Sequence, residues 1–278
     1  MSHARRPAPG GAPGHTLRYT VNCSLLFTEL PLLERPAAAR AAGFDAVEFW
    51  WPFESAVPAD KDVEAFIAAL DDAGVHLTGL NFFAGALPGP DRGVLSRPDR
   101  VGEFRDNIDV VLGIAERTGT RAFNALYGLR QEGVDPAEQD RLALESVLAA
   151  AAAVAAVDGT VLIEPISGAP DYPLTTAADG LAFVARARAA GARNVALLAD
   201  FFHLAVNGDD VASVVRDHAA DFGHIQIADA PGRGEPGTGE LPIHALLAAA
   251  QAGGYGGHVG LEYKPTVPSS DSFGWLRA

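Results

Sequence analysis

The chain has 278 residues, of which 48% are hydrophobic and 20% are charged, a balance typical of a globular protein and not of a disordered or fibrous one. Asp and Glu number 35 against 21 Lys and Arg, so the formal net charge is -14 and a nucleic-acid backbone would be repelled on average. We therefore expect neither DNA nor RNA as a partner. No stretch is long and apolar enough to predict a membrane span.

The amino-terminal segment, residues 1–16, reads MSHARRPAPGGAPGHT and has no apolar run that could form the core of a signal peptide. We expect it to be a disordered tail, followed by one domain over residues 17–278. The single cysteine, Cys23, allows no intramolecular disulfide and favours a reducing compartment. Together these features predict a cytoplasmic protein.

From residue 17 onward, short apolar strands alternate with helical segments at a spacing near 30 residues. The expected strands are residues 17–23, 46–50, 76–81, 122–126, 160–164, 195–200, 224–228 and 258–262. The expected helices are residues 32–42, 62–73, 98–118, 135–157, 176–190, 209–220 and 241–251. This order predicts the α/β class and a single (β/α)8 TIM barrel, with a doubly wound open sheet as the alternative.

Each of the last four expected strands carries an oxygen-bearing side chain at or near its end. These side chains are Glu164, Asp200, Gln226 and Glu262. The carboxyl ends of the strands of a parallel barrel meet at one rim, where the active site of such a fold lies. Carboxylate and amide oxygens without a thiolate favour a hard divalent cation, so the four residues predict a site for Mg2+ or Mn2+.

Two further side chains follow these strand ends closely. His203 comes three residues after Asp200, where the chain leaves the sixth strand, and Arg233 lies in the glycine-rich loop after Gln226. An arginine there could hold a substrate carboxylate with two parallel hydrogen bonds. Residues 232–237 also match G-x-G-x-x-G, but Pro236 in the turn and a helix that starts only near residue 241 argue against dinucleotide binding.

Several segments of the chain resemble the hydroxypyruvate isomerase family of xylose isomerase-like TIM barrels. The most specific are residues 233–240 (RGEPGTGE) and 260–265 (GLEYKP), supported by residues 22–27 (NCSLLF), 43–49 (GFDAVEF), 162–166 (LIEPI), 200–203 (DFFH) and 224–229 (HIQIAD). The resemblance implies that Glu164 and Glu262 are the catalytic acid and base. It also implies that Glu164, Asp200, Gln226 and Glu262 bind the metal, and that His203 and Arg233 contact the substrate. Glu48 and Asn81 are further candidates to bind substrate.

The resemblance implies an enzyme that interconverts hydroxypyruvate and tartronate semialdehyde. In the mechanism we expect, one glutamate removes a carbon-bound proton, a metal stabilises the enediolate, and the second glutamate or a relayed proton completes the transfer. The partner would be a small 2-oxo or hydroxy acid, and the barrel surface could support a homo-oligomer.

Four alternatives stay open at this point. A 2-oxo-tetronate isomerase would use the same residues. A ketose 3-epimerase would be expected to carry histidine in place of Gln226. A DNA-repair endonuclease would need a histidine-rich zinc site and a basic face, and a non-catalytic sugar-acid binding protein would catalyse no proton exchange.

Overall fold

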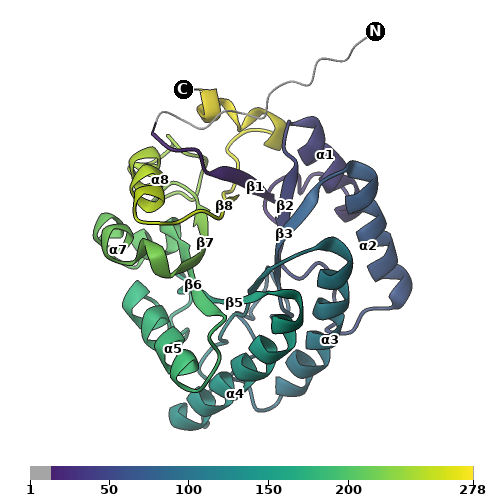
Figure 1. Ribbon diagram of the computed structural model, residues 1–278, viewed down its shortest axis with the longest axis vertical. Helices are drawn as coiled ribbons and strands as arrows, with labels where there is room; N and C mark the ends of the chain where they lie inside the picture. Colours follow the sequence, from purple (N-terminus) through teal and green to yellow (C-terminus); the bar gives the residue numbers. More distant parts are fainter. Residues whose placement is uncertain (1–13, 278) are drawn as a thin grey trace.

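The computed structural model describes residues 14–277, in which eight parallel strands close into a barrel in sequence order (Figure 1). The strands are β1 (Arg18–Asn22), β2 (Ala46–Phe49), β3 (His76–Asn81), β4 (Ala122–Asn124), β5 (Thr160–Ile163), β6 (Val195–Asp200), β7 (Phe222–Ile227) and β8 (His258–Leu261). β8 pairs with β1, and this pairing closes the ring. The prediction of a TIM barrel is confirmed, and the open sheet is excluded.

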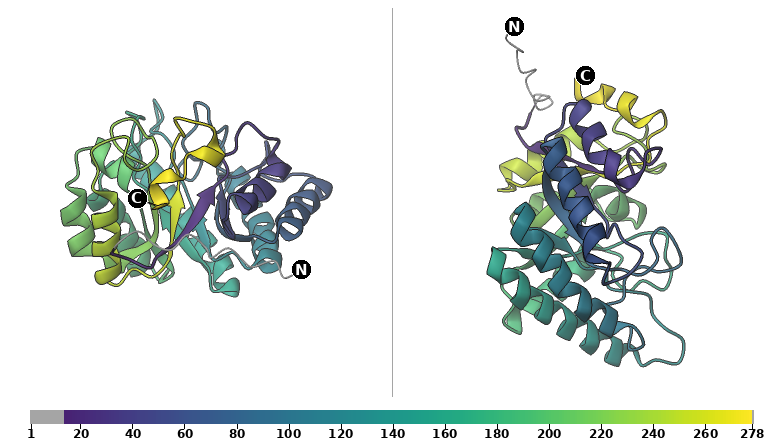
Figure 2. Two further views of the ribbon diagram at one scale, coloured as in Figure 1. Left: turned by 90° about the horizontal axis from the view of Figure 1, so that it is seen from above. Right: turned by 90° about the vertical axis from the view of Figure 1, so that its right-hand side faces the viewer.

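Helices surround the strands on the outside of the barrel (Figures 1 and 2). They are α1 (Arg35–Ala41), α2 (Asp60–Ala73), α3 (Val101–Thr118), α4 (Pro136–Val154), α5 (Ala177–Ala189), α6 (Phe201–Val206), α7 (Val211–His218) and α8 (Ile243–Ala252), with short 3-10 segments at Leu32–Glu34, Ala155–Val157, Ala219–Asp221, Ser269–Asp271 and Gly274–Arg277. None of the helices within residues 14–277 is long and apolar enough to cross a membrane.

Local sequence signals fix where several of these helices begin and end. Asp135 caps α4 by accepting a hydrogen bond from the backbone N–H of Ala137, and Pro136 occupies the first turn. α2 and α3 end at Gly74 and Gly119, which have left-handed φ values of 64° and 76°. The sequence predicted these boundaries to within three residues, because caps of this kind depend only on nearby residues.

α6 was not predicted. It is a six-residue helix that follows β6 without any intervening loop, and Asp200 is both the last residue of the strand and the cap of the helix. Its sequence, FFHLAV, is too short to show a helical period. The consequence for function is direct, because α6 carries His203 over the end of the barrel.

The two ends of the described chain pack against the barrel. The expected tail lies outside the described residues as far as residue 13, but His15 is buried and the backbone N–H of Thr16 donates to Gln251 in α8. Towards the carboxyl end, Phe273 packs edge-on against Phe44, 4.7 Å between ring centroids. The carboxyl-terminal segment therefore lies beside β1 and α1, as Figure 1 shows.

Candidate functional site

The carboxyl ends of β5 to β8 bring the four predicted metal ligands together. Glu164 and Glu262 follow β5 and β8 directly, Asp200 is the last residue of β6, and Gln226 lies one residue before the end of β7. Asp200 and Gln226 are paired in the β6–β7 register. All four side chains are buried, with between 0% and 5% of their surface exposed.

Asp200 has one oxygen engaged by the backbone and one free. Its Oδ1 accepts from the backbone N–H groups of Phe202, at 2.8 Å, and His203, at 3.4 Å, at the start of α6. Its Oδ2 has no hydrogen-bond partner among residues 14–277. The cap thus holds the carboxylate rigidly and leaves one oxygen for another ligand.

Gln226 provides a second buried acceptor atom that has no hydrogen-bond partner among the described residues. Its Oε1 is buried and accepts no hydrogen bond from any residue of the described chain. Two buried acceptors on paired positions of neighbouring strands, beside the carboxylate of Glu164, would be costly unless something electropositive binds between them. The donor set therefore fits a hard divalent cation, for which Asp200 Oδ2 and Gln226 Oε1 are the acceptors without a partner among residues 14–277.

His203 lies close enough to be considered as a ligand, since one atom each of Glu164, Asp200 and His203 lie within 4.8 Å of one another. The backbone N–H of Ser167 donates to His203 Nδ1 at 3.0 Å, so Nδ1 must be an acceptor. Burial lowers the pKa of His203 well below its usual value, with a smaller effect of Arg233.

The neutral ring of His203 therefore carries its proton on Nε2, which lies 3.6 Å from Asp200 Oδ2 and 3.9 Å from Glu164 Oε1. A protonated nitrogen donates hydrogen bonds and cannot ligate a metal. The geometry suits the predicted substrate contact of His203 better than a place among the metal ligands.

The two predicted catalytic glutamates have perturbed pKa values. Burial raises the pKa of Glu164 to about 8, and the charge of Asp200 adds to the shift. Burial also raises the pKa of Glu262 well above its usual value, although Arg233 opposes the change. Buried carboxyl groups with raised pKa values at a functional site are typical of general acids and bases.

Arg233 approaches the site from the glycine-rich loop after β7. Its Nη2 donates to Glu262 Oε1 at 2.7 Å and lies 3.7 Å from Asp200 Oδ2, and its guanidinium stacks over the ring of Phe202. Nε is buried and has no partner among the described residues. The side chain is therefore anchored at one nitrogen and keeps further N–H groups for an anionic substrate.

The carboxylate of Asp229 organises the loop that carries Arg233. It accepts hydrogen bonds from the backbone N–H groups of Ala230, Gly237 and Leu241, at 2.8 to 2.9 Å. Arg233 itself has a left-handed φ of 60°, and its N–H donates to the carbonyl of Asp229. The loop is thus folded around one buried carboxylate, which fixes the direction of the arginine.

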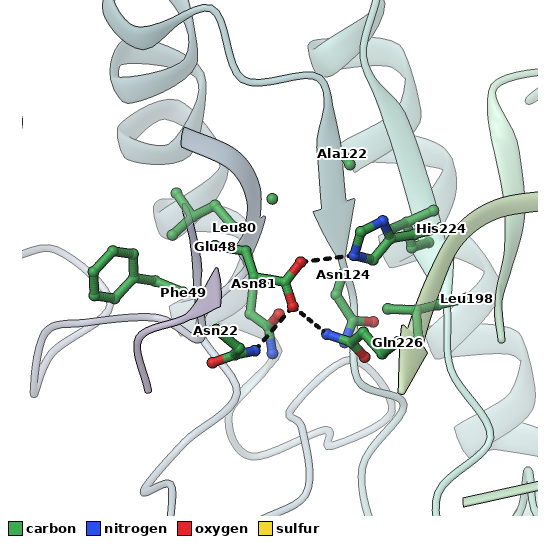
Figure 3. Close-up of a pocket in the computed structure, with 12 residues that line it drawn as sticks. Asn22, Glu48, Phe49, Leu80, Asn81, Ala122, Asn124, Leu198, His224 and Gln226 are labelled. Atoms are coloured by element: carbon green, nitrogen blue, oxygen red, sulfur yellow. Dashed lines mark hydrogen bonds and ion pairs between the residues drawn. The ribbon is translucent and has the colours of Figure 1, made fainter. Parts of the chain in front are cut away.

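Glu48 and Asn81 lie in the barrel interior. Figure 3 shows the Glu48 carboxylate surrounded by Asn22, His224 and Gln226. Asn81 ends β3 and is paired with Asn124 of β4, and both side chains line the same pocket. Within the described chain Glu48 contacts these three side chains, and the substrate contacts of Glu48 and Asn81 stay predictions.

Several residues that contact the predicted site residues were not predicted from the sequence. Asn124 donates to Glu164 Oε2 at 2.6 Å, Asn22 donates to Glu262 Oε2 at 2.9 Å, and Ser167 holds His203. Asn22 and Asn124 end β1 and β4, so the signal was the same as for β5 to β8, a polar side chain at a strand end. Ser167 offered no such signal, because a loop serine is common.

Comparison with known proteins relates the chain to the xylose isomerase-like TIM barrels and to isomerases among them. A family model described as xylose isomerase-like TIM barrel matches residues 36–278. A protein of Streptomyces coelicolor named "Putative hydroxypyruvate isomerase" is 54% identical over 94% of this chain and 96% of its own length. A 2-oxo-tetronate isomerase of Cupriavidus necator is 36% identical, and a hydroxypyruvate isomerase of Escherichia coli 31% identical, each over 94% of this chain and at least 97% of the relative.

Solved structures share the fold. The crystal structure of an AP endonuclease, family 2, from Brucella melitensis superposes with a TM-score of 0.84 at 30% identity and covers 94% of this chain and 98% of its own. A 3-keto-D-glucoside 4-epimerase from E. coli gives a TM-score of 0.73 at 22% identity, covering 93% of this chain and 98% of its own, and this likeness shows the fold alone.

Proposed function

The chain belongs to the xylose isomerase-like TIM barrel family and is an isomerase related to the hydroxypyruvate isomerases, and on this premise we propose that it interconverts hydroxypyruvate and tartronate semialdehyde. The identity of 54% to a relative of that name, over nearly the whole of both chains, supports this choice of substrate. The observation that carries the chemistry is the placement of two buried glutamates, Glu164 and Glu262, at one rim of the barrel, beside the unpartnered acceptor atoms of Asp200 and Gln226 within residues 14–277.

The reaction needs a proton to move between neighbouring carbons. We propose that one of Glu164 and Glu262 removes a proton from the hydroxymethyl carbon, and the electron pair moves towards the carbonyl to give an enediolate. The other glutamate returns a proton to the former carbonyl carbon, and a hydroxyl proton passes from one substrate oxygen to the other. A divalent cation held at Asp200, Gln226, Glu164 and Glu262, which we propose to be Mg2+ or Mn2+, would polarise the carbonyl and offset the charge of the enediolate.

Two other residues would orient the substrate. In this proposal Arg233 binds the carboxylate of the 2-oxo acid, supported by its unpartnered, buried Nε within the described chain. His203 donates from Nε2 to a substrate oxygen, supported by the Ser167 contact that leaves the proton on that nitrogen. Both side chains are mostly buried, so their hydrogen bonds would be shielded from water.

A second candidate substrate is the four-carbon 2-oxo-tetronate. Relatives named 2-oxo-tetronate isomerase, at 36% and 29% identity, favour it, and the same residues would act on both acids. A ketose epimerase is less well supported, because Gln226 stands where we expected histidine in that class. A DNA-repair endonuclease was expected to have a histidine-rich zinc site, whereas the cluster found here holds two carboxylates and one histidine.

The choice between the two substrates is tested by measuring kcat/KM for hydroxypyruvate and for 2-oxo-tetronate with the purified protein and Mg2+ or Mn2+. A value at least tenfold higher for hydroxypyruvate supports the proposal. A higher kcat/KM for 2-oxo-tetronate would contradict the proposal and identify the four-carbon acid as the substrate. A homo-oligomer and a cytoplasmic location stay predictions of the sequence.

A further inference from the structure

Glu48, in β2, lies beside the predicted metal ligand Gln226, and both of its carboxylate oxygens are engaged (Figure 3). Oε1 accepts from Asn22 Nδ2 at 3.1 Å and from Gln226 Nε2 at 2.8 Å, and Oε2 lies 2.7 Å from His224 Nε2. Only 3% of the residue is exposed. Three N–H donors around a buried carboxylate are typical of a group that holds other side chains in place.

The contact with Gln226 determines which end of its amide faces the predicted metal position. The oxygen and nitrogen ends of an amide have nearly the same shape, but only the oxygen can ligate a cation. A reversed amide would place Gln226 Oε1 against Glu48 Oε1, two acceptors with no proton between them. The arrangement with Nε2 on Glu48 is therefore strongly favoured, and it leaves Oε1 buried and without a partner among residues 14–277.

The neighbouring strand β8 is shaped to allow this contact. A Cβ atom on Gly260 would lie 2.6 Å from Glu48 Oε1 and 2.8 Å from Gln226 Cγ, closer than real Cβ contacts. Gly260 is not among the glycines with a left-handed φ, so its backbone would accept alanine. The absence of a side chain at Gly260 instead makes room for the Glu48 carboxylate and the Gln226 side chain.

Asn22 donates hydrogen bonds both to Glu48 and to the predicted catalytic residue Glu262. Its Nδ2 donates to Glu48 Oε1 and also to Glu262 Oε2, at 2.9 Å. Its Oδ1 accepts from the backbone N–H of Ser24 at 3.0 Å, which fixes the direction of this amide as well. Asn22 can keep its contacts with Ser24 and Glu262 without Glu48, so among the predicted metal ligands only the amide of Gln226 depends on Glu48 directly.

We propose that Glu48 is a positioning residue that holds the amide of Gln226 with its oxygen towards the divalent cation. The inference rests on the metal-assisted isomerase proposed above, and it assigns to Glu48 a role in metal affinity in place of the substrate contact that the sequence suggested. Glu48 acts through Gln226, so its effect must disappear when the amide of Gln226 is absent.

The test is calorimetric titration of metal-free protein with Mn2+. In Glu48→Gln the new Oε1 can still accept from Gln226 Nε2, while its NH2 group donates to His224, whose proton would move to the other ring nitrogen. We expect the Kd of this variant to stay within about threefold of the wild type, whereas Glu48→Leu, which offers no acceptor, should raise the Kd about tenfold or more.

A double-mutant cycle separates positioning from other effects. Gln226→Leu should weaken Mn2+ binding, and Glu48→Leu added to it should weaken binding no further. Wild-type Mn2+ affinity in Glu48→Leu would overturn the inference. Equal losses of Mn2+ affinity in Glu48→Leu and Glu48→Gln would also overturn it, because they would indicate a role of charge alone. So would losses of affinity that add in the double variant.

Melting of each metal-free variant serves as the folding control. If Glu48→Leu does not fold, Glu48→Met gives the same test, because methionine is close to glutamate in length and offers no comparable acceptor to Gln226 Nε2. Weaker Mn2+ binding by this variant supports the inference, and unchanged binding contradicts it. If wild-type protein isomerises the substrate but binds no Mn2+, both the metal role and the inference fail while the isomerase survives. If it binds Mn2+ without turnover, only the proposed reaction fails.

Discussion

Arg233 donates from Nη2 to Glu262 Oε1 at 2.7 Å, so the predicted substrate-binding arginine directly contacts a predicted catalytic glutamate. Glu262 also accepts from Asn22 at its other oxygen, so both of its oxygens are held by N–H groups. These contacts orient the carboxylate, and the positive charge of Arg233 opposes the rise in the pKa of Glu262 that burial causes. The arginine thus has two expected effects, on substrate binding and on the state of the glutamate.

Arg233→Lys tests the first effect. Lysine keeps the charge but loses the planar group that can donate two parallel hydrogen bonds to a carboxylate. We expect kcat/KM to fall on the order of tenfold or more, mainly through KM. The matched control is Arg216→Lys, which changes an exposed arginine paired with Asp217 on the surface. An unchanged KM in Arg233→Lys would contradict the assigned carboxylate contact.

Glu164→Gln and Glu262→Gln test the proton transfer. Each change keeps the shape of the side chain and an acceptor oxygen but removes the group that gains and loses a proton. We expect kcat to fall by about a thousandfold in each variant, within the range that general acid–base catalysis supplies. Glu64→Gln, at an exposed pair with Arg117, is the control and should turn over normally. If either site variant keeps its turnover, that glutamate does not transfer the proton.

The raised pKa of Glu164 predicts how the stability of metal-free protein depends on pH. A carboxyl group whose folded pKa, about 8, lies above its unfolded value binds more protons when folded. Its contribution is therefore fully present below about pH 4.5 and is lost as the pH rises through 8. Buried His203, whose pKa is lowered, acts in the opposite direction but only around and below pH 6.5.

Glu164→Gln isolates this contribution, because glutamine cannot ionise and can still accept from Asn124. Without metal, the variant should melt roughly 3 °C or more above the wild type at pH 8.5, and the difference should shrink towards pH 5. Thermal melts of both proteins across that range measure it. A difference that does not change with pH would show that the pKa of Glu164 is not raised.

Asp229→Asn should loosen the loop that carries Arg233. Both oxygens of Asp229 accept backbone N–H groups, and asparagine replaces one oxygen with an NH2 group. At least one buried N–H then loses its acceptor, at a cost of about 1 to 3 kcal/mol. We expect a lower melting temperature together with a higher KM for the 2-oxo acid. A lower melting temperature with an unchanged KM would mean that the loop does not position Arg233.

The fold could be predicted from the sequence because each strand and helix had its own local signal. His76–Asn81 and Val195–Asp200 were predicted to the residue, and the boundaries of the other strands differ by at most two residues. α6 was not predicted from the sequence because a single residue, Asp200, both ends the strand and caps the helix. No period can be read from six residues, so only the tertiary structure reveals this helix.

The sequence predicted which side chains would meet at the rim but not the hydrogen bonds between them. Polar strand ends indicated Glu164, Asp200, Gln226 and Glu262, and the structure places all four at the carboxyl ends of β5 to β8, since every strand of a parallel barrel ends at the same rim. Their roles stay predictions. The sequence could not show that Asn22 joins Glu48 to Glu262, because hydrogen bonds across the barrel depend on strand register and tilt. The substrate contact of Glu48 stays a prediction of the sequence.

The proposed isomerisation is tested most directly by proton NMR of hydroxypyruvate in heavy water with metal-stripped protein, before and after addition of Mg2+ or Mn2+. We expect tartronate semialdehyde to form, with deuterium exchange at the hydroxymethyl carbon, and we expect both to depend on the added cation. Absence of product and of exchange in the presence of either cation would contradict the proposed reaction. Full turnover in the stripped protein would contradict the part assigned to the metal.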